Sequence, residues 1–396
     1  MPIAEFEREV RTFLDAHAKP RPDVTLEWGV GSDTVGAFPE LTLEEERAEL
    51  DASRAWRRTL FEHDLGWITG PDEYGGRGLS ADHERRFVEI SSSYDLPDQV
   101  CFSLSLGMVA PTILRHGTAT TRARYLRAIH RGDVLACQLF SEPGAGSDLA
   151  SLSTRAVRHG DGWRLSGQKV WTSRAHLAEV GLCLARTGTP ESRHRGLTCF
   201  LVDMHAPGVT VRPLRQMTGG ATFNEVFLDD VHVDDDHRLG DVDAGWATAI
   251  TTLMNERQRI GGGNGGVPEI DVPRLIALVR QRRLAADPVT RDAFARLLAL
   301  DRATAWTAAR GQAQARQGRD PGPEMSAAKL LRTATATALA EFVARVIGPA
   351  IVADTGEWGT YAWAQLVLGQ PGVRIGGGTD EILRNVLAER TLGLPR

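Results

Sequence analysis

The β-type part of this sequence is confined to one internal stretch, and this limits the folds that the chain can adopt. From Ala136 to about Val233, short apolar runs alternate with turn signals, as in a small β domain with antiparallel strands. The segments before and after this stretch place apolar residues at helical spacing. The order is therefore helical, β and helical again, and we expect an α+β fold that is mainly α.

The signals for individual elements divide the chain into three expected domains. Thr42 and Glu45 form a Thr-x-x-Glu capping box at the start of a helix. The other expected helices are 82–90, 121–130, 246–260, 272–285, 291–317, 326–347 and 379–390. The expected strands are 163–166, 180–185, 197–202, 209–213 and 225–228. We place an N-terminal helical domain at 1–133, a middle β domain at 134–237 and a C-terminal helical domain at 238–396.

Composition excludes several classes of protein. Hydrophobic residues make up 42% of the 396 residues and charged residues 24%, as in ordinary globular proteins. The net charge of −5 disfavours a nucleic-acid binder. The four cysteines include no CxxC pair, so we expect neither a disulfide scaffold nor a zinc site. The N-terminus has no apolar signal core and no run reaches the length of a membrane helix, so the expected location is the cytoplasm.

A glycine-rich segment at 138–148 is a candidate ligand-binding loop. Its sequence is Gln-Leu-Phe-Ser-Glu-Pro-Gly-Ala-Gly-Ser-Asp. Small residues let another molecule approach the backbone, and hydroxyl and free N–H groups can donate to a phosphate or to a polar ring edge. An ordinary polar turn explains the composition equally well.

A second candidate segment follows at 167–173, with the sequence Gly-Gln-Lys-Val-Trp-Thr-Ser. An indole followed by two hydroxyls can stack on a flat conjugated ring and hydrogen-bond its edge. A Trp buried in the core is the commoner explanation when such a residue stands alone. Asp and His residues at 229–237 could also suggest a metal site, but a solvated acidic loop is the better interpretation, and we predict no metal.

These two segments together resemble the acyl-CoA dehydrogenase family. The family pattern is Thr/Ser-Glu-Pro-x-Ala-Gly-Ser-Asp followed by Gly-x-Lys-x-Trp-x-Thr/Ser, and both are matched here. Three further segments agree with the family in order along the chain. They are Pro-Asp-Glu-Tyr-Gly-Gly-Arg-Gly at 71–78, Asn-Glu-Arg at 255–257, and Gly-Gly-Thr-Asp-Glu-Ile-Leu-Arg-Asn at 377–385 with Ala-Glu-Arg at 388–390. The resemblance runs from about residue 40 to the end.

The resemblance implies a three-domain fold, a cofactor and a reaction. The domains are an N-terminal helical domain, a middle β-barrel or β-sandwich domain and a C-terminal four-helix bundle, with FAD between the last two. The implied reaction removes an α proton and a β hydride from an acyl thioester. The implied cofactor-binding residues are Gln138, Leu139, Phe140, Ser141, Gly146, Ser147, Trp171, Thr172, Ser173, Thr379 and Glu381. Ser147, Arg257 and Gly378 are the residues implied to contact the substrate.

The catalytic base implied by the resemblance is Glu256. Many family members carry the base in a Tyr-Glu-Gly-Thr stretch, but alignment on Thr379 places Gly377 at that position, where no base is available. Isovaleryl-CoA dehydrogenase and related members carry the base on the helix before the bundle, and Glu256 matches that position. A solvated carboxylate paired with an Arg is the alternative interpretation of Glu256.

Two family segments that contact the FAD of a neighbouring subunit are missing from this sequence. The Arg-x-x-Phe-Gly motif is absent from 272–285, and the stretch at 346–350 reads Val-Ile-Gly-Pro-Ala. FAD contacts across a subunit interface are therefore not expected from these segments. The resemblance implies a homodimer or homotetramer, or a heteromer with a paralogous chain, and an electron acceptor resembling electron-transfer flavoprotein. Two alternative functions stay open. One is a flavin-dependent monooxygenase or oxidase on the same fold, and the other is a partner subunit that completes the FAD site of another chain.

Overall fold

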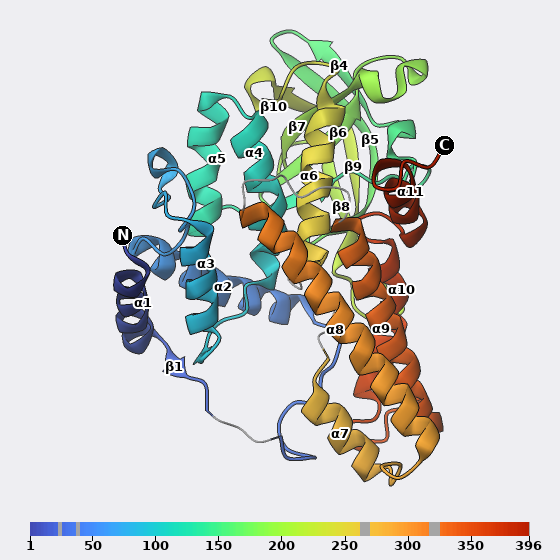
Figure 1. The fold of residues 1–396 in the computed structure, drawn as a ribbon. Coiled ribbons are helices and arrows are strands. Elements are labelled where there is room, and N and C mark those ends of the chain that lie inside the picture. Colours follow the sequence, from blue (N-terminus) through green and yellow to red (C-terminus); the bar gives the residue numbers. More distant parts are fainter. Residues whose placement is uncertain (23–25, 37–39, 262–269, 317–324, 396) are drawn as a thin grey trace. The chain divides into compact units, whose positions relative to one another are not determined.

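The computed structural model describes residues 1–396 except 23–25, 37–39, 262–269, 317–324 and 396. The chain divides into two compact units, which we describe separately (Figure 1). Unit 1 comprises Met1–Asp23, Leu41–Leu214 and Ala221–Thr252. Unit 2 comprises Val24–Glu40, Arg215–Gly220 and Leu253–Arg396.

The first part of unit 1 is helical, as the sequence predicts. Its α-helices are α1 (Ile3–His17), α2 (Leu43–Glu62), α3 (Ala81–Ser91), α4 (Ala110–His116) and α5 (Ala119–Arg131), with a short β1–β2 pair of Lys19–Pro20 and Tyr94–Asp95. The capping box at Thr42 is present, because its side chain accepts from Glu45 N and Glu45 bonds back to Thr42 N. Helix α1, which was not predicted, buries Phe6 and Val10 against Trp56 of α2.

The middle part of unit 1 is a β-sheet with mixed strand directions. The strands are β3 (Ala136–Leu139), β4 (Arg155–His159), β5 (Gly162–Ser173), β6 (Val180–Arg186), β7 (Leu197–Asp203), β8 (Val209–Leu214), β9 (Phe223–Asp234) and β10 (Arg238–Leu239). Their order is β10-β7-β6-β4-β5-β9-β8, with β3 paired to β6. The β3–β6 and β4–β6 pairings are parallel, whereas the sequence suggested only antiparallel strands.

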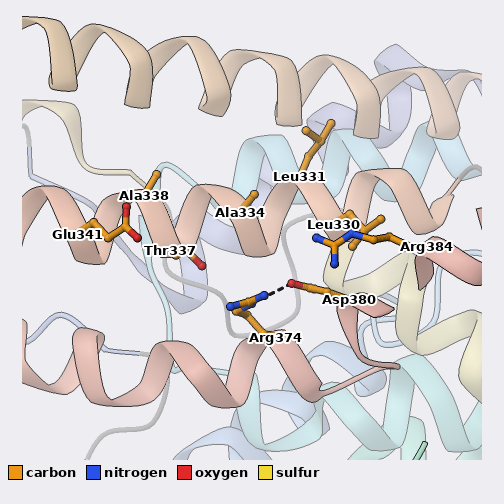
Figure 2. A pocket seen from close by; sticks show the side chains of 9 residues that line it. All are labelled: Leu330, Leu331, Ala334, Thr337, Ala338, Glu341, Arg374, Asp380 and Arg384. Carbon is orange, nitrogen blue, oxygen red and sulfur yellow. Dashed lines mark hydrogen bonds and ion pairs between the residues drawn. The ribbon is translucent and has the colours of Figure 1, made fainter. Parts of the chain in front are cut away.

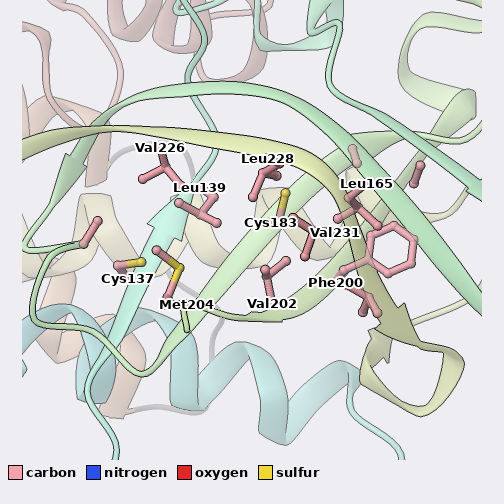
Figure 3. Close-up of a cluster of buried hydrophobic side chains, with 14 of the residues drawn as sticks. Cys137, Leu139, Leu165, Cys183, Phe200, Val202, Met204, Val226, Leu228 and Val231 are labelled. Atoms are coloured by element: carbon pink, nitrogen blue, oxygen red, sulfur yellow. The ribbon is translucent and has the colours of Figure 1, made fainter. Parts of the chain in front are cut away.

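The core of this sheet positions the two candidate segments. Leu139, Leu165, Phe200 and Val226 pack in one cluster of buried side chains (Figure 3). The first two residues of the glycine-rich segment, Gln138 and Leu139, end β3, and the Trp-Thr-Ser sequence lies at the C-terminal end of β5. Each segment therefore starts from a strand whose register is fixed by buried side chains.

Unit 2 is built from long helices. They are the C-terminal part of α6 (Gly245–Gly261), together with α7 (Val272–Gln281), α8 (Pro288–Arg316), α9 (Met325–Ile347), α10 (Ala362–Ile375) and α11 (Asp380–Arg390). Helix α7 ends before the predicted Ala285, because Arg283 has φ 58° and stops the helical ladder. Helix α10 was not predicted, because it contains Pro371.

Helix α9 is the central helix of unit 2. It packs against α8 and α10, and its buried residues include Leu339, Phe342 and Val343. Within the described ranges, Met325–Ile351 is the one stretch long and apolar enough to cross a membrane. A core helix passes the same test, and the buried Lys329 inside this stretch fits a core helix, so the finding is weak evidence for a membrane span.

Candidate active site

The glycine-rich segment forms an exposed loop at the end of β3. Leu139 and Phe140 are 0% and 3% exposed, so both residues are buried, and Phe140 O accepts from Lys169 Nζ. Gln138 and Ser141 are half-buried, whereas Gly146 and Ser147 are exposed. The described residues provide no acceptor for the backbone N–H groups of Gly146 and Ser147.

The space in front of this loop is open. A Cβ atom added at Gly144 or at Gly146 would meet no atom within 4 Å. Free N–H groups beside open space form a cradle for an anionic or polar group, such as the phosphates or ring edge of a flavin nucleotide. The residues present therefore fit the cofactor that the sequence implies.

Trp171 lies at an irregular point of β5. The register between β5 and β9 shifts between Lys169 and Thr172, so the strand carries a bulge there. Trp171 has φ 59°, and its side chain is 57% exposed although it is a large apolar group. Thr172 is fully buried and Ser173 half-buried. An exposed indole held by a strained backbone, with a hydroxyl two residues further on, is suited to stack on a flat ligand.

A buried ion pair connects the two segments. Lys169 Nζ donates to Glu142 Oε1 at 2.9 Å, to Phe140 O at 3.0 Å and to Leu184 O at 2.8 Å. Glu142 also accepts from Ser153 N, Ser153 Oγ and Thr154 N at 2.6–2.9 Å. Burial alone would raise the pKa of Glu142, but the charge of Lys169 and these hydrogen bonds lower it to about 2.

A second group of hydrogen-bonded polar side chains lies next to the Trp-Thr-Ser segment. His176 Nε2 faces Glu46 Oε2 at 2.6 Å, and His176 Nδ1 faces Asn224 Oδ1 at 2.9 Å. Asn224 is the β9 partner of Thr172, and the Asn224 Nδ2 and Thr172 Oγ1 atoms are buried without a hydrogen-bond partner. Burial would lower the pKa of His176, but its hydrogen bonds to Glu46 and Asn224 and the charge of Glu46 raise that pKa above its ordinary value.

We expect this pair to make stability depend on pH. Because the pKa of His176 is raised in the folded protein, the protonated pair stabilises the fold fully below the unfolded pKa of about 6.5. That contribution is lost as pH rises through the folded pKa. His176→Gln should therefore cost about 2 kcal/mol of unfolding free energy at pH 6 and less at pH 8.5. Thermal unfolding of the wild type and of His176→Gln between pH 6 and pH 8.5 measures this difference in unfolding free energy. A difference that does not change with pH would contradict the raised pKa of His176.

The remaining predicted residues lie in unit 2. Glu256 and Arg257 are half-buried on α6. Burial lowers the pKa of Arg257, which the charge of Glu256 partly offsets. Arg257 Nη2 lies 3.8 Å from the position of a Cβ added at Gly378. Two of the residues implied to contact the substrate, Arg257 and Gly378, are therefore neighbours.

The turn between α10 and α11 is held by a buried lysine. Lys329 Nζ, on α9, donates to Gly378 O at 2.9 Å and to Arg374 O at 3.2 Å, and lies 3.7 Å from Asp380 Oδ1. Burial lowers the pKa of Lys329, and the charges of Asp380 and Glu256 act in the opposite direction.

The backbone conformation of this turn requires its two central glycines. Gly377 and Gly378 have φ values of 67° and 93°, which favour glycine. A glutamate at position 377, where many family members carry their base, would be strained here. Thr379 caps α11 by accepting from Ile382 N at 3.2 Å, and Glu381 is exposed in the first turn of that helix.

A groove of about 440 Å³ lies on unit 2 beside this turn (Figure 2). Its apolar wall is formed by α9 residues, and Arg374 Nε reaches Asp380 Oδ2 at 2.9 Å across it. The groove is lined by Leu330, Leu331, Ala334, Thr337, Ala338, Glu341, Arg374, Asp380 and Arg384. None of the predicted site residues lines it.

The acidic loop at 229–237 brings three possible ligand atoms together. Atoms of Asp234, Asp236 and His237 lie within 4.8 Å of one another, and both carboxylates are exposed. His237 Nδ1 already contacts Asp236 Oδ1 at 2.9 Å. Exposed acidic groups are common without an ion, and this cluster supports no metal site.

The structure distributes the predicted residues between the two units. Those from Gln138 to Ser173 lie in unit 1, and Glu256, Arg257, Gly378, Thr379 and Glu381 lie in unit 2. Sequence reasoning did not identify the pairs Lys169–Glu142 and His176–Glu46. Both Lys169 and Glu142 stand inside the quoted motifs, which was the available signal.

The chain matches three domain profiles that together describe one enzyme family. The acyl-CoA dehydrogenase N-terminal domain matches residues 4–133, the middle domain residues 137–231 and the C-terminal domain residues 243–392. The chain belongs to the acyl-CoA dehydrogenase family. This confirms the family resemblance and the predicted order of a helical, a β and a helical domain in this acyl-CoA dehydrogenase.

Several curated relatives carry the same family name. Acyl-CoA dehydrogenase FadE34 of Mycobacterium tuberculosis is 45% identical over 395 residues, which are 98% of this chain and 52% of FadE34. The chain thus spans about half the length of that relative. Acyl-CoA dehydrogenase IpdE1 of the same organism is 39% identical over 358 residues, 89% of this chain and 90% of IpdE1. Benzylmalonyl-CoA dehydrogenase of Aromatoleum aromaticum is 30% identical over 381 residues, 93% of this chain and 98% of that protein.

A solved structure agrees with the fold over the full chain. A chain of the ChsE4–ChsE5 complex from Mycobacterium tuberculosis has a TM-score of 0.72 and 26% identity, and the match covers 100% of this chain and 98% of that chain. The named relatives support flavin-dependent acyl-CoA dehydrogenation as the reaction of the family to which this chain belongs.

Proposed function

We propose that this chain is an FAD-dependent acyl-CoA dehydrogenase in which Glu256 removes the α proton of an acyl thioester. The observation that carries the proposal is Trp171, an indole that is 57% exposed at φ 59° between a buried lysine and two hydroxyl residues. A left-handed backbone at a non-glycine residue costs stability, and such strain is concentrated at functional sites. Membership of the family makes a flavin the expected ligand.

Several of the predicted residues in unit 1 then have a defined task. Gly146 and Ser147 donate backbone N–H groups, with Ser141 and Ser173 adding hydroxyls, and Trp171 covers the ring edge. When bound, FAD supplies the acceptor for the hydride that leaves the β carbon.

Glu256 takes the α proton as that hydride leaves, so a saturated thioester becomes an α,β-unsaturated one. The proton is weakly acidic, and hydrogen bonds to the thioester carbonyl are needed to stabilise the enolate-like charge. Arg257 and Gly378, which are neighbours in unit 2, are the chain's candidates for contact with the substrate.

Two other functions remain as alternatives. A monooxygenase or oxidase on this fold would react with O2 and would not need Glu256. A partner subunit would complete the flavin site of another chain and would carry no flavin of its own. The open loop and the exposed Trp171 favour a chain that binds its own cofactor.

An absorbance spectrum followed by anaerobic titration separates these functions. We expect the purified protein to carry oxidised flavin, and an acyl-CoA to bleach it without oxygen. A colourless protein that gains no flavin on reconstitution would support the partner-subunit function. Flavin that acyl-CoAs do not bleach, but that turns over with NADH and O2, would support the oxygen-using enzyme.

The acyl group should be tested with thioesters that differ at the α carbon. Benzylmalonyl-CoA, the substrate named for one relative, carries a ring substituent at that carbon. The series should include straight-chain, 2-methyl and ring-substituted acyl-CoAs and one acyl carrier-protein thioester. It compares which acyl groups the enzyme accepts and whether it prefers CoA or a carrier protein. The extent and rate of bleaching rank these substrates.

We also propose that the chain assembles through the exposed face of α9 with a second chain of the same fold, either a copy or a paralogue. Leu330, Leu331, Ala334 and Ala338 form an apolar stripe at helical spacing along the groove. Glu341 and Arg384 supply opposite charges at the rim of this stripe. The complex of ChsE4 with ChsE5 supports a partner of this kind.

Ala334→Glu is expected to break this assembly. Ala334 is exposed at the centre of the stripe, so a charge there would be buried by a partner chain. Light scattering during size-exclusion chromatography should show a drop in mass for this variant. Val289→Glu, at an apolar position on α8 that is 61% exposed, should leave the mass unchanged. If the wild type, Ala334→Glu and Val289→Glu all have the same mass, the subunit interface does not include this face of α9.

We propose an electron acceptor resembling electron-transfer flavoprotein and a cytoplasmic location. Reduction of such an acceptor by the bleached enzyme tests the first. Fractionation of cells that express the full protein tests the second.

A further inference from the structure

The buried pair Lys169–Glu142 joins more of unit 1 than any single hydrogen bond could. Through its three donors, Lys169 on β5 holds the end of β3 at Phe140, the loop at Glu142, and β6 at Leu184. Glu142 in turn holds the start of β4 through the N–H groups of Ser153 and Thr154. One ion pair therefore fixes the entry and the exit of the glycine-rich loop to the strand that carries Trp171.

Both charges are almost completely removed from water, and their bonding is complete. The side chains of Lys169 and Glu142 are 0% and 4% exposed. An ammonium has three donors, and all three of those on Lys169 have acceptors. Well-packed apolar residues of similar volume are often as stabilising as a buried ion pair, or more so. The attraction between the two charges therefore does not by itself explain their presence, whereas their hydrogen bonds to the backbone fix one arrangement of these segments.

The arrangement that the pair fixes is the one that a flat ligand would need. Val170 N donates to Ser141 O at 2.9 Å, so the loop and the strand are bonded directly beside the pair. Trp171 follows at the bulge, two residues after Lys169. On the other side of Glu142, the loop turns through Gly144 and Gly146 with open space in front.

We propose that Lys169 and Glu142 are positioning residues for the flavin. They set the distance between the N–H cradle at Gly146 and Ser147 and the indole of Trp171. This inference rests on the proposed function, because it presumes that the ligand of these segments is FAD. Neither residue touches the cofactor in this role, since both side chains are enclosed by the sheet.

The test is FAD binding by the full-length protein after flavin removal and reconstitution. The main variant is the double substitution Lys169→Met with Glu142→Leu, which replaces both charges with apolar side chains of similar size. We expect its melting temperature without flavin to fall, because Phe140 O, Leu184 O and the N–H groups of Ser153 and Thr154 lose their partners. At a temperature where the variant is folded, its dissociation constant for FAD should rise at least tenfold and its bound-flavin absorbance bands should shift. A stable double variant with the wild-type FAD constant and spectrum would overturn the proposal.

A second variant keeps the proposal testable if the double variant does not fold. Glu142→Gln is nearly isosteric, and hydrogen exchange should become faster at the bonded amides of Ala145 and Val170, together with weaker FAD binding. Unchanged exchange at both amides would also overturn the proposal.

Arg186→Met is the matched control for loss of a buried charge in the same sheet. Arg186 is 5% exposed and donates to Leu152 O and Ala150 O. We expect this variant to lose stability while its FAD dissociation constant stays within twofold of the wild-type value. An equal loss of FAD affinity in this control would mean that general loosening of the sheet explains the effect, and would overturn the positioning role. Failure of the wild-type protein to bind FAD at all would instead refute the proposed function.

Discussion

Glu256→Gln is expected to lower kcat by about 10²–10⁴-fold while flavin stays bound. The amide has nearly the shape of the carboxylate but cannot accept the α proton at neutral pH. Position 256 is half-buried on α6, so the substitution should not disturb the core. Stopped-flow measurement of flavin bleaching by acyl-CoA gives the rate of the chemical step directly, and the flavin absorbance of the same sample reports the bound cofactor.

Two controls separate a base from a structural carboxylate. Glu256→Asp keeps an ionisable group on a shorter side chain and should recover part of the bleaching rate. Asp292→Asn removes a carboxylate that forms a surface pair with Arg296, and should leave the rate unchanged. Bleaching within twofold of wild type in Glu256→Gln would remove Glu256 from the mechanism.

Lys329→Met is expected to cost about 3 kcal/mol of unfolding free energy, toward the lower end of the range for breaking a buried pair. The lysine side chain is 0% exposed, and its loss leaves Gly378 O and Arg374 O without their donor. Asp380 keeps Arg374 Nε at 2.9 Å and Thr333 Oγ1 at 2.9 Å, which limits the cost. Urea unfolding followed by circular dichroism measures the change.

The matched control for this variant is a surface pair in the same unit. Arg296→Ala breaks the exposed Arg296–Asp292 pair and should cost less than about 1 kcal/mol. A similarly small loss in Lys329→Met would show that the turn at Gly376–Thr379 finds other donors.

Local signals were sufficient for much of the fold. The capping box at Thr42 fixed the start of α2, and helical spacing in the sequence from 326 onward predicted α9 within one residue of its start at Met325. Helix α10 was not predicted from the sequence, because glycine and proline residues such as Gly369 and Pro371 normally interrupt helices. The parallel pairing of β3 with β6 could not be read from either strand, since strand direction depends on the path of the intervening chain.

The candidate site was predictable only as separate pieces. Motif matches named the loop around Gly146, the strand at Trp171 and the turn at Gly378, because these carry characteristic residues at fixed spacing. The contacts that support them join distant positions, such as Lys169 with Glu142 and His176 with Glu46. No periodicity in the sequence encodes such pairs, so they became visible only with the fold.

The backbone at Trp171 implies a trade-off between stability and function. A left-handed conformation costs a non-glycine residue roughly 1–2 kcal/mol, and glycine at this position would remove that strain. Glycine would also remove the ring. Stability alone would therefore favour glycine at position 171, so tryptophan there is better explained by a bound ligand than by the folded polypeptide itself.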